Sequence, residues 1–155
     1  IPNLSSIMAC YQVFRGQAGP KIIADGGIRN AGDIVKALAA GADFVMCGSM
    51  LAGTDEAPGE LLNIEGKGLC KEYRGMASRE AQNSWRGTSS SPEGIATIIS
   101  HKGSVKNILK DLAGNIRSGF SYSGARNIKE LREKATFIKQ SPASVQEGFT
   151  HILNK

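Results

Sequence analysis

Two short turns of small residues carry the groups best suited to chemistry. Asp25-Gly26-Gly27 follows one apolar segment, and Gly48-Ser49 follows the next. Glycine lets backbone N–H groups approach an anion without a Cβ in the way, and a serine hydroxyl adds a donor. A carboxylate such as Asp25 can accept hydrogen bonds from both hydroxyls of a ribose, or can equally cap the following turn. The pair of turns therefore predicts a phosphate site, with simple tight turning as the alternative.

The segments around these turns have the pattern of a βαβ unit. Residues 21–24 and 43–47 are short apolar strands that we expect to be buried, and residues 31–40 have the apolar spacing of a helix. Asn30 suits the N-cap of this helix, and Gly41 stands where a helix commonly ends. Strands joined in this way form a parallel sheet, whose carboxyl ends share one edge. Both turns are thus expected at the same edge.

Residues 54–94 differ in composition from their surroundings, being rich in glycine, serine, proline, asparagine and charge. Such a segment inside a compact domain is typically a functional lid or a disordered insertion, and the lid is favoured here. We predict a mobile flap that contains a hairpin around residues 65–68. Its best candidate for a mobile loop is residues 88–92.

Four further elements are expected after the flap. They are a strand at 95–100, a long helix capped by Ser104, a short helix at 128–134 capped by Asn127, and a final strand at 136–139. The C-terminal tail, residues 141–155, is polar and poorly patterned. The alternation of strands and helices places the chain in the α/β class.

Composition disfavours several kinds of partner. The formal charge is +5, but basic residues are spread out and alternate with acidic ones in residues 129–134, which argues against nucleic acid. Cys10, Cys47 and Cys70 lack paired spacing, which argues against a disulfide framework or a metal site and favours the cytoplasm. No apolar run approaches the roughly 20 residues that span a bilayer. We expect no metal, membrane or nucleic-acid partner.

Several motifs resemble the IMP dehydrogenase / GMP reductase family. The long ones are residues 23–29, 32–42, 45–54, 56–60 and 71–78, and shorter matches occur at 93–94, 101–104 and 122–125. The joined pattern from 23 to 60 is highly specific, and the likeness covers nearly the whole chain. It implies that residues 1–155 are the carboxy-terminal portion of a single TIM (β/α)8 barrel domain, with the flap at 54–94 inserted into it.

The likeness also implies a role for each matched residue. Asp25 would bind the ribose hydroxyls of a purine nucleotide. The 5′-phosphate would be held by Gly26, Gly27, Gly48 and Ser49. The purine would be contacted by Tyr73, Gly75, Met76 and Ala77.

Proton transfer and cofactor binding are assigned in the same way. Glu93 falls where reductases of the family have a glutamate implicated in proton transfer near the nucleotide. A stretch that contacts NADPH in reductases matches Ser118, Gly119, Phe120 and Ser121, of which only Ser118 is alike. The family further suggests a homotetramer with the cofactor near a subunit boundary.

The family's nucleophilic cysteine belongs to a loop that should end just before Ile1, and none of the three cysteines lies in that motif. Cys10 and Cys47 are instead expected to be small core residues, and Cys70 an incidental flap residue. We therefore expect a fragment that needs the preceding part of the barrel. Alone, it should bind nucleotide poorly and be inactive.

Three departures favour GMP reductase within the family. The flap is short, no Arg-Tyr pair lies between Tyr73 and Glu93, and only Glu147 remains of the Glu-Ser-His cation motif of dehydrogenases. NADPH-dependent reductive deamination of GMP to IMP is thus the favoured reaction. NAD-dependent oxidation of IMP to XMP, with a monovalent cation such as potassium, stays open because residues 116–139 resemble bacterial dehydrogenases at least as well. A non-catalytic purine-nucleotide-binding barrel is a third possibility.

Overall fold

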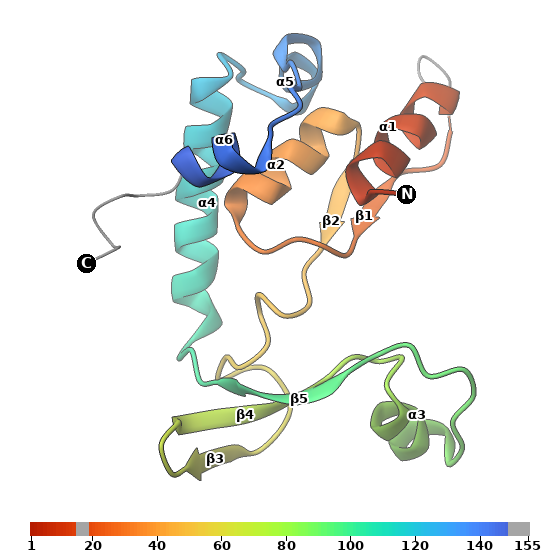
Figure 1. Cartoon of the computed structure of the whole chain (residues 1–155), viewed down its shortest axis with the longest axis vertical. Coiled ribbons are helices and arrows are strands. Elements are labelled where there is room, and N and C mark those ends of the chain that lie inside the picture. The colour runs from red at the N-terminus through yellow and green to blue at the C-terminus, as the bar shows by residue number, and fades with distance from the viewer. Residues whose placement is uncertain (15–18, 149–155) are drawn as a thin grey trace.

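Two parallel strands and the helices that cover them form the larger part of the molecule. The computed structural model describes residues 1–14 and 19–148 (Figure 1). Strand β1 (Ile23–Asp25) pairs in parallel with β2 (Phe44–Met46), and helix α2 (Ala31–Ala40) connects them. The Asn30 side chain accepts a hydrogen bond from the N–H of Asp33, as an N-cap does. The predicted βαβ unit is therefore confirmed.

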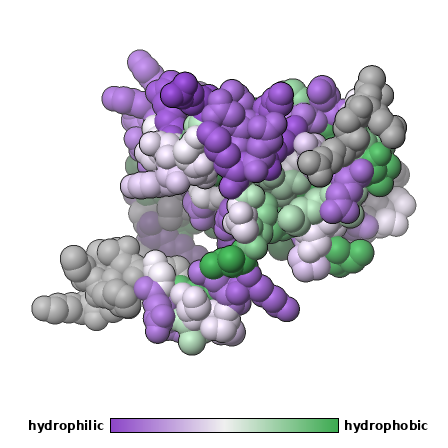
Figure 2. Space-filling view, turned by 90° about the horizontal axis from the view of Figure 1, so that it is seen from above, coloured by the Kyte–Doolittle hydropathy of each residue, from purple (hydrophilic) through white to green (hydrophobic). Residues whose placement is uncertain are grey.

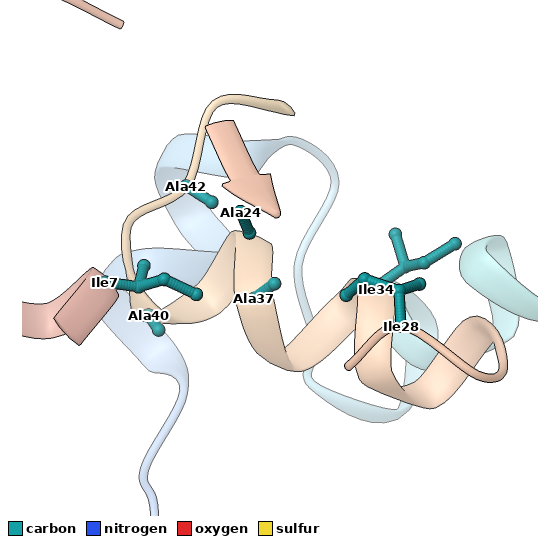
Figure 3. Packing of buried hydrophobic residues seen from close by; sticks show 7 residues of the cluster. All are labelled: Ile7, Ala24, Ile28, Ile34, Ala37, Ala40 and Ala42. Carbon is teal, nitrogen blue, oxygen red and sulfur yellow. The ribbon is translucent and has the colours of Figure 1, made fainter. Parts of the chain in front are cut away.

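Helix α2 is the centre of the helical layer. Helices α1 (Asn3–Phe14), α4 (Val105–Tyr122) and α5 (Ile128–Lys134) all pack against it. Between α2 and one face of the sheet lies a core of seven residues (Figure 3), which are Ile7, Ala24, Ile28, Ile34, Ala37, Ala40 and Ala42. Four of the seven are alanines, and such small side chains let the helix and the strands approach closely.

The other face of the sheet is open. Ile23, Phe44 and Met46 are 54%, 58% and 50% exposed, so the prediction of fully buried strands was wrong for these side chains. Successive strand residues face opposite sides, so only one set reaches the helical core. A parallel sheet is normally covered on both faces, and the described residues cover one. Seen from above, hydrophilic residues cover the upper part of the view, and apolar residues gather in patches near its middle and at the right (Figure 2).

The flap is a separate antiparallel sheet with one helix. Strands β3 (Leu61–Ile64), β4 (Gly68–Arg74) and β5 (Ala96–Ser100) pair in sequence order, which confirms the predicted hairpin. Helix α3 (Arg79–Arg86) lies between β4 and β5. The flap is thus more regular than its composition predicted. Strand β5, expected to follow the flap, belongs to its sheet and extends it to Ser100.

The C-terminal segments depart from their predictions. Residues 136–139 form no strand, because Phe137 packs against the helical core instead of pairing with a strand edge. Helix α6 (Pro142–Glu147) occupies the start of the predicted tail, with Ser141 as N-cap and proline in its first turn. The remainder of that tail, residues 149–155, lies outside the described residues.

Two cysteines also differ from their predicted roles. Cys10 is exposed on α1, because Ile7 and Tyr11, one helical turn apart, occupy the face toward α2. Cys70 is 2% exposed and lies in β4, the middle strand of the flap sheet. Cys47 is half-buried directly after β2.

Gly41→Ala is expected to lower the free energy of unfolding by about 2–4 kcal/mol. Gly41 ends α2 with φ of 122°, and a Cβ there would overlap the ring of Tyr11. Gly114→Ala is the matched control, because nothing lies within 4 Å of a Cβ at that position in α4. The control should stabilise the helix by up to about 1 kcal/mol. Urea denaturation measures the free energy of unfolding of both variants, and an equal change in the two would contradict the steric argument.

Candidate functional site

The two small-residue turns lie at the same carboxyl edge of the parallel strands, as predicted. Asp25 is the last residue of β1 and pairs in register with Met46, the last residue of β2. Gly26 and Gly27 have φ of 92° and 76°, a region that favours glycine. No atom lies within 4 Å of a Cβ at either position, so the first turn is an open backbone cradle. This geometry suits an anion approaching the peptide N–H groups.

Asn3 fixes the first turn and was missed from the sequence. Its Nδ2 donates to the carbonyl oxygen of Gly26 at 2.7 Å and to that of Asp25 at 3.2 Å. A small cavity of about 130 Å³ lies beside this contact and is also lined by Gly27. No local pattern could reveal the contact, because it joins residues 22 and 23 positions apart.

The second turn borders a larger cleft, of about 860 Å³, between the loop after β2 and the flap. Gly48, Tyr73 and Met76 all line it. The hydroxyl of Tyr73 lies 3.3 Å from the place that a Cβ on Gly48 would occupy, so it stands directly over the turn. The structure therefore brings a predicted phosphate residue together with two predicted purine contacts.

Glu93 lies next to the other residues predicted to contact the purine. The N–H groups of Glu93 and Gly94 donate to the carbonyl oxygen of Ala77 at 3.0 and 3.1 Å, and the N–H of Gly75 donates to Ile95 at 3.1 Å. A Cβ on Gly94 would overlap the backbone nitrogen of Ser78, so this close approach needs glycine. The Glu93 side chain itself is exposed.

Residues Ser118–Ser121 do not join this cleft within one chain. They lie near the end of α4, which runs away from the flap in Figure 1. At 1.5 Å per residue, Ser118 is about 20 Å along the helix from Val105, which lines the cleft. The Ser118 hydroxyl donates back to Gly114, and Gly119 packs closely against Val35. These four residues do not form a nicotinamide site with the flap of the same chain.

Cysteine and metal chemistry find little support in the described parts of the chain. Burial raises the pKa of the Cys47 thiol, which keeps it protonated and a poor nucleophile. No group of three histidine, cysteine or acidic side chains that could hold a metal ion occurs among residues 1–14 and 19–148.

No helix of the described chain has both the length and the apolar character needed to cross a membrane.

Glu56 ties the loop after β2 to the start of α4. Its carboxylate accepts hydrogen bonds from the Ser104 hydroxyl at 2.7 Å and from the N–H of Val105 at 2.8 Å. The Val105 N–H, followed by the Ser104 hydroxyl, holds the pKa of Glu56 below its usual value of 4.5. A carboxylate at a helix N-terminus is also favoured by the helix dipole.

Glu56→Gln is expected to lower stability at neutral pH, by an amount that shrinks in acid. Because the folded-state pKa is lowered, the charged form contributes fully above 4.5 and loses its contribution as pH falls through the folded-state value. Urea denaturation from about pH 7 to about pH 3 measures the difference. Glu65→Gln, in the exposed hairpin turn, is the control. A difference between wild type and Glu56→Gln that is constant with pH would assign the effect to packing instead.

Fold and site together define a class, an α/β protein with glycine-containing turns at the carboxyl ends of its parallel strands and a flap that contacts the second of these turns. The chain belongs to the IMP dehydrogenase / GMP reductase family, whose domain matches residues 1–151. The α/β prediction is thereby confirmed. The described residues form two strands of a parallel sheet and no closed barrel.

Relatives named as IMP dehydrogenases and relatives named as GMP reductases are about equally similar to the chain. It is 46% identical to an inosine-5′-monophosphate dehydrogenase of Aquifex aeolicus (strain VF5), covering 97% of the chain and 32% of that relative. It is 44% identical to a GMP reductase of Leishmania major, covering all of the chain and 33% of that relative. The chain therefore spans about a third of the length of these proteins.

A solved structure is similar over the same extent. It is a GMP reductase from Trypanosoma brucei in complex with guanosine 5′-monophosphate, with a TM-score of 0.88 and 45% identity. The match covers 97% of this chain and 32% of that one. These identities are too close to one another to separate the two reactions.

Proposed function

We propose that this chain provides the nucleotide-binding edge of a purine nucleotide oxidoreductase. The observation that carries the proposal is the contact of the second strand-end turn with the flap, where the Tyr73 hydroxyl stands over Gly48. Both strand-end turns and the adjoining flap lie at the carboxyl edge of the parallel strands, where barrel enzymes place their active sites. Membership of the IMP dehydrogenase / GMP reductase family supports the same conclusion.

The favoured reaction is the NADPH-dependent reductive deamination of GMP to IMP. In it the bond between C2 of the purine and its amino nitrogen breaks, a C2–H bond forms, and ammonia leaves. A nicotinamide cofactor, when bound, supplies the hydride. The nucleophilic thiolate that forms the covalent adduct would come from outside this chain, because none of Cys10, Cys47 and Cys70 lies in the cysteine motif of the family.

The chain's own residues bind the nucleotide and move a proton. Backbone N–H groups of the two turns hold the 5′-phosphate, and Asp25 accepts hydrogen bonds from the ribose hydroxyls. The backbone of residues 75–77 orients the purine. Glu93, fixed beside Ala77 by its own N–H at 3.0 Å, transfers a proton at the leaving amino group.

The chain performs this role as the carboxy-terminal portion of a complete (β/α)8 barrel. The outer edges of β1 and β2 lack a partner strand in the described chain, and Ile23, Phe44 and Met46 face outward. The remaining strands of the barrel would pair with these edges and cover this apolar face. Assembly as a homotetramer would let Ser118–Ser121 of one subunit reach the cofactor of its neighbour.

IMP dehydrogenase is the second candidate, because the chain is about as similar to the Aquifex aeolicus dehydrogenase, at 46% identity, as to the Leishmania major GMP reductase, at 44%. It would oxidise IMP to XMP with NAD and a monovalent cation such as potassium. A purine-nucleotide-binding barrel without catalysis is the third.

The test is to supply the complete protein with GMP and NADPH, or with IMP and NAD⁺, and to follow absorbance at the reduced nicotinamide band. Loss of absorbance with GMP and NADPH is expected. A rise in absorbance with IMP and NAD⁺ would instead show that the reaction is that of IMP dehydrogenase. Tight GMP binding without either change would favour the non-catalytic barrel, and failure to bind any purine nucleotide would overturn the proposal.

A further inference from the structure

A lysine at the end of the flap reaches the backbone of the second turn. Lys102 follows β5, and its Nζ donates to the carbonyl oxygens of Ser49 at 2.7 Å and of Met50 at 3.2 Å. An ammonium group has three N–H donors, and its hydrogen bonds are strengthened by the charge. Two of these donors are therefore used on consecutive carbonyls of the turn proposed to hold the phosphate.

The backbone around Lys102 is itself attached to the same loop. Its N–H donates to the carbonyl oxygen of Gly53 at 2.9 Å, and the N–H of Asp55 donates to Gly103 at 3.0 Å. The Nε2 of His101 lies 2.6 Å from Oδ1 of Asp55. The ammonium group thus extends from a fixed base, so its contact with the turn needs little ordering of the chain that carries it.

The neighbouring flap strand makes a second attachment of the same kind. Lys71 in β4 is 6% exposed, and its Nζ donates to the carbonyl oxygens of Thr54 at 3.0 Å and Asp55 at 3.2 Å. Both strands at the base of the flap are therefore joined to the loop after β2 through ammonium–carbonyl contacts. Movement of the flap would have to occur beyond this base, in the segment that carries α3.

The hydrogen bonds from Lys102 to the carbonyl oxygens of Ser49 and Met50 orient the peptide groups of the second turn. The peptide group is planar, with its C=O and N–H pointing in opposite directions. When Lys102 binds the carbonyl of Ser49, it turns the N–H of Met50 to the opposite side. It also places a full positive charge within 3.2 Å of the turn's backbone, which favours a dianion nearby.

We propose that Lys102 is a positioning residue for phosphate recognition, which fixes the second turn from the base of the flap. The inference rests on the proposed function, because it takes the second turn to be the phosphate site. Lys102 acts through the backbone of Ser49 and Met50 and through its charge. Loss of the Lys102 side chain should therefore weaken the binding of ligands that carry a phosphate and change the affinity for the corresponding nucleoside little.

The experiment is to measure binding of GMP, guanosine and inorganic phosphate to the complete protein by calorimetry, for wild type and Lys102→Met. The variant is expected to bind GMP about 10–100-fold more weakly, the range for loss of hydrogen bonds to a charged group. Guanosine affinity should change by less than about 2-fold, and competition by inorganic phosphate should weaken in parallel with GMP. In turnover assays KM for the nucleotide should rise while kcat stays within about 3-fold.

Two further variants separate positioning from folding. Lys102→Arg should recover most of the GMP affinity, because a guanidinium can donate to two carbonyls. Lys106→Met, an exposed lysine in the first turn of α4, should behave as wild type. Equal weakening of GMP and guanosine, or unchanged GMP affinity in Lys102→Met, would overturn the inference. A wild-type protein that binds neither ligand would overturn the proposed function and the inference with it.

Discussion

Glu93→Gln is expected to lower turnover of the complete enzyme by about 10²–10⁴-fold while leaving GMP affinity nearly unchanged. Glutamine keeps the size of the side chain and can donate and accept hydrogen bonds, but it cannot give up or take a proton at the purine. The backbone position is insensitive to the change, because it depends on the Glu93 N–H and the Ala77 carbonyl at 3.0 Å. Single-turnover kinetics with GMP and NADPH, beside calorimetric GMP binding, measures both quantities.

Glu80→Gln is the matched control for this experiment. Glu80 is an exposed glutamate in the first turn of α3, within the same flap. Its substitution should leave turnover within about 3-fold of wild type. Turnover that survives Glu93→Gln would remove the proton-transfer role, and equal losses in both variants would point to a general effect of flap charge.

Asp25→Ala should instead weaken binding of the nucleotide, by about 100-fold or more. A carboxylate that accepts hydrogen bonds from two ribose hydroxyls contributes about 1.5–3 kcal/mol through each. Asp25 is placed for this role because it ends β1, with its side chain exposed on the face away from the helical core. Calorimetry with GMP measures the loss, and kcat at saturating nucleotide should fall far less.

A double-mutant cycle makes the Asp25 prediction specific. Wild type should lose most of its affinity when GMP is replaced by its 2′,3′-dideoxy analogue, because the hydroxyls are then absent. Asp25→Ala should show almost no further loss with that analogue. If both forms of the protein discriminate equally between the two ligands, Asp25 only caps its turn.

The local structure of the chain was largely predictable. The helix at Ala31–Ala40 was predicted with its observed bounds, since an Asn cap, apolar spacing and a terminal glycine all lie within a few residues of one another. The flap hairpin and the Asn127-capped helix follow from signals that are equally local. The two strand-end turns at one edge followed from the rule that parallel strands share direction.

The errors fell where a distant partner decides the outcome. Residues 136–139 have strand-like composition, but Phe137 packs on the helical core, and a strand without a partner does not form. Cys70 is buried in the middle strand of the flap sheet, and β5 belongs to that sheet because it pairs with β4. The apolar periodicity of β4 or of β5 does not indicate that these two strands pair with each other.

The sequence by itself determined most of the elements, the strand-end turns and the family to which the chain belongs. Only the tertiary structure decided which groups support those turns. Asn3 reaches Gly26 across 23 positions, and Lys102 reaches Ser49 across 53. Tyr73 meets Gly48 only because the flap folds back over the sheet edge. Such contacts depend on how whole elements pack, and helical or strand periodicity records only which face of each element is apolar.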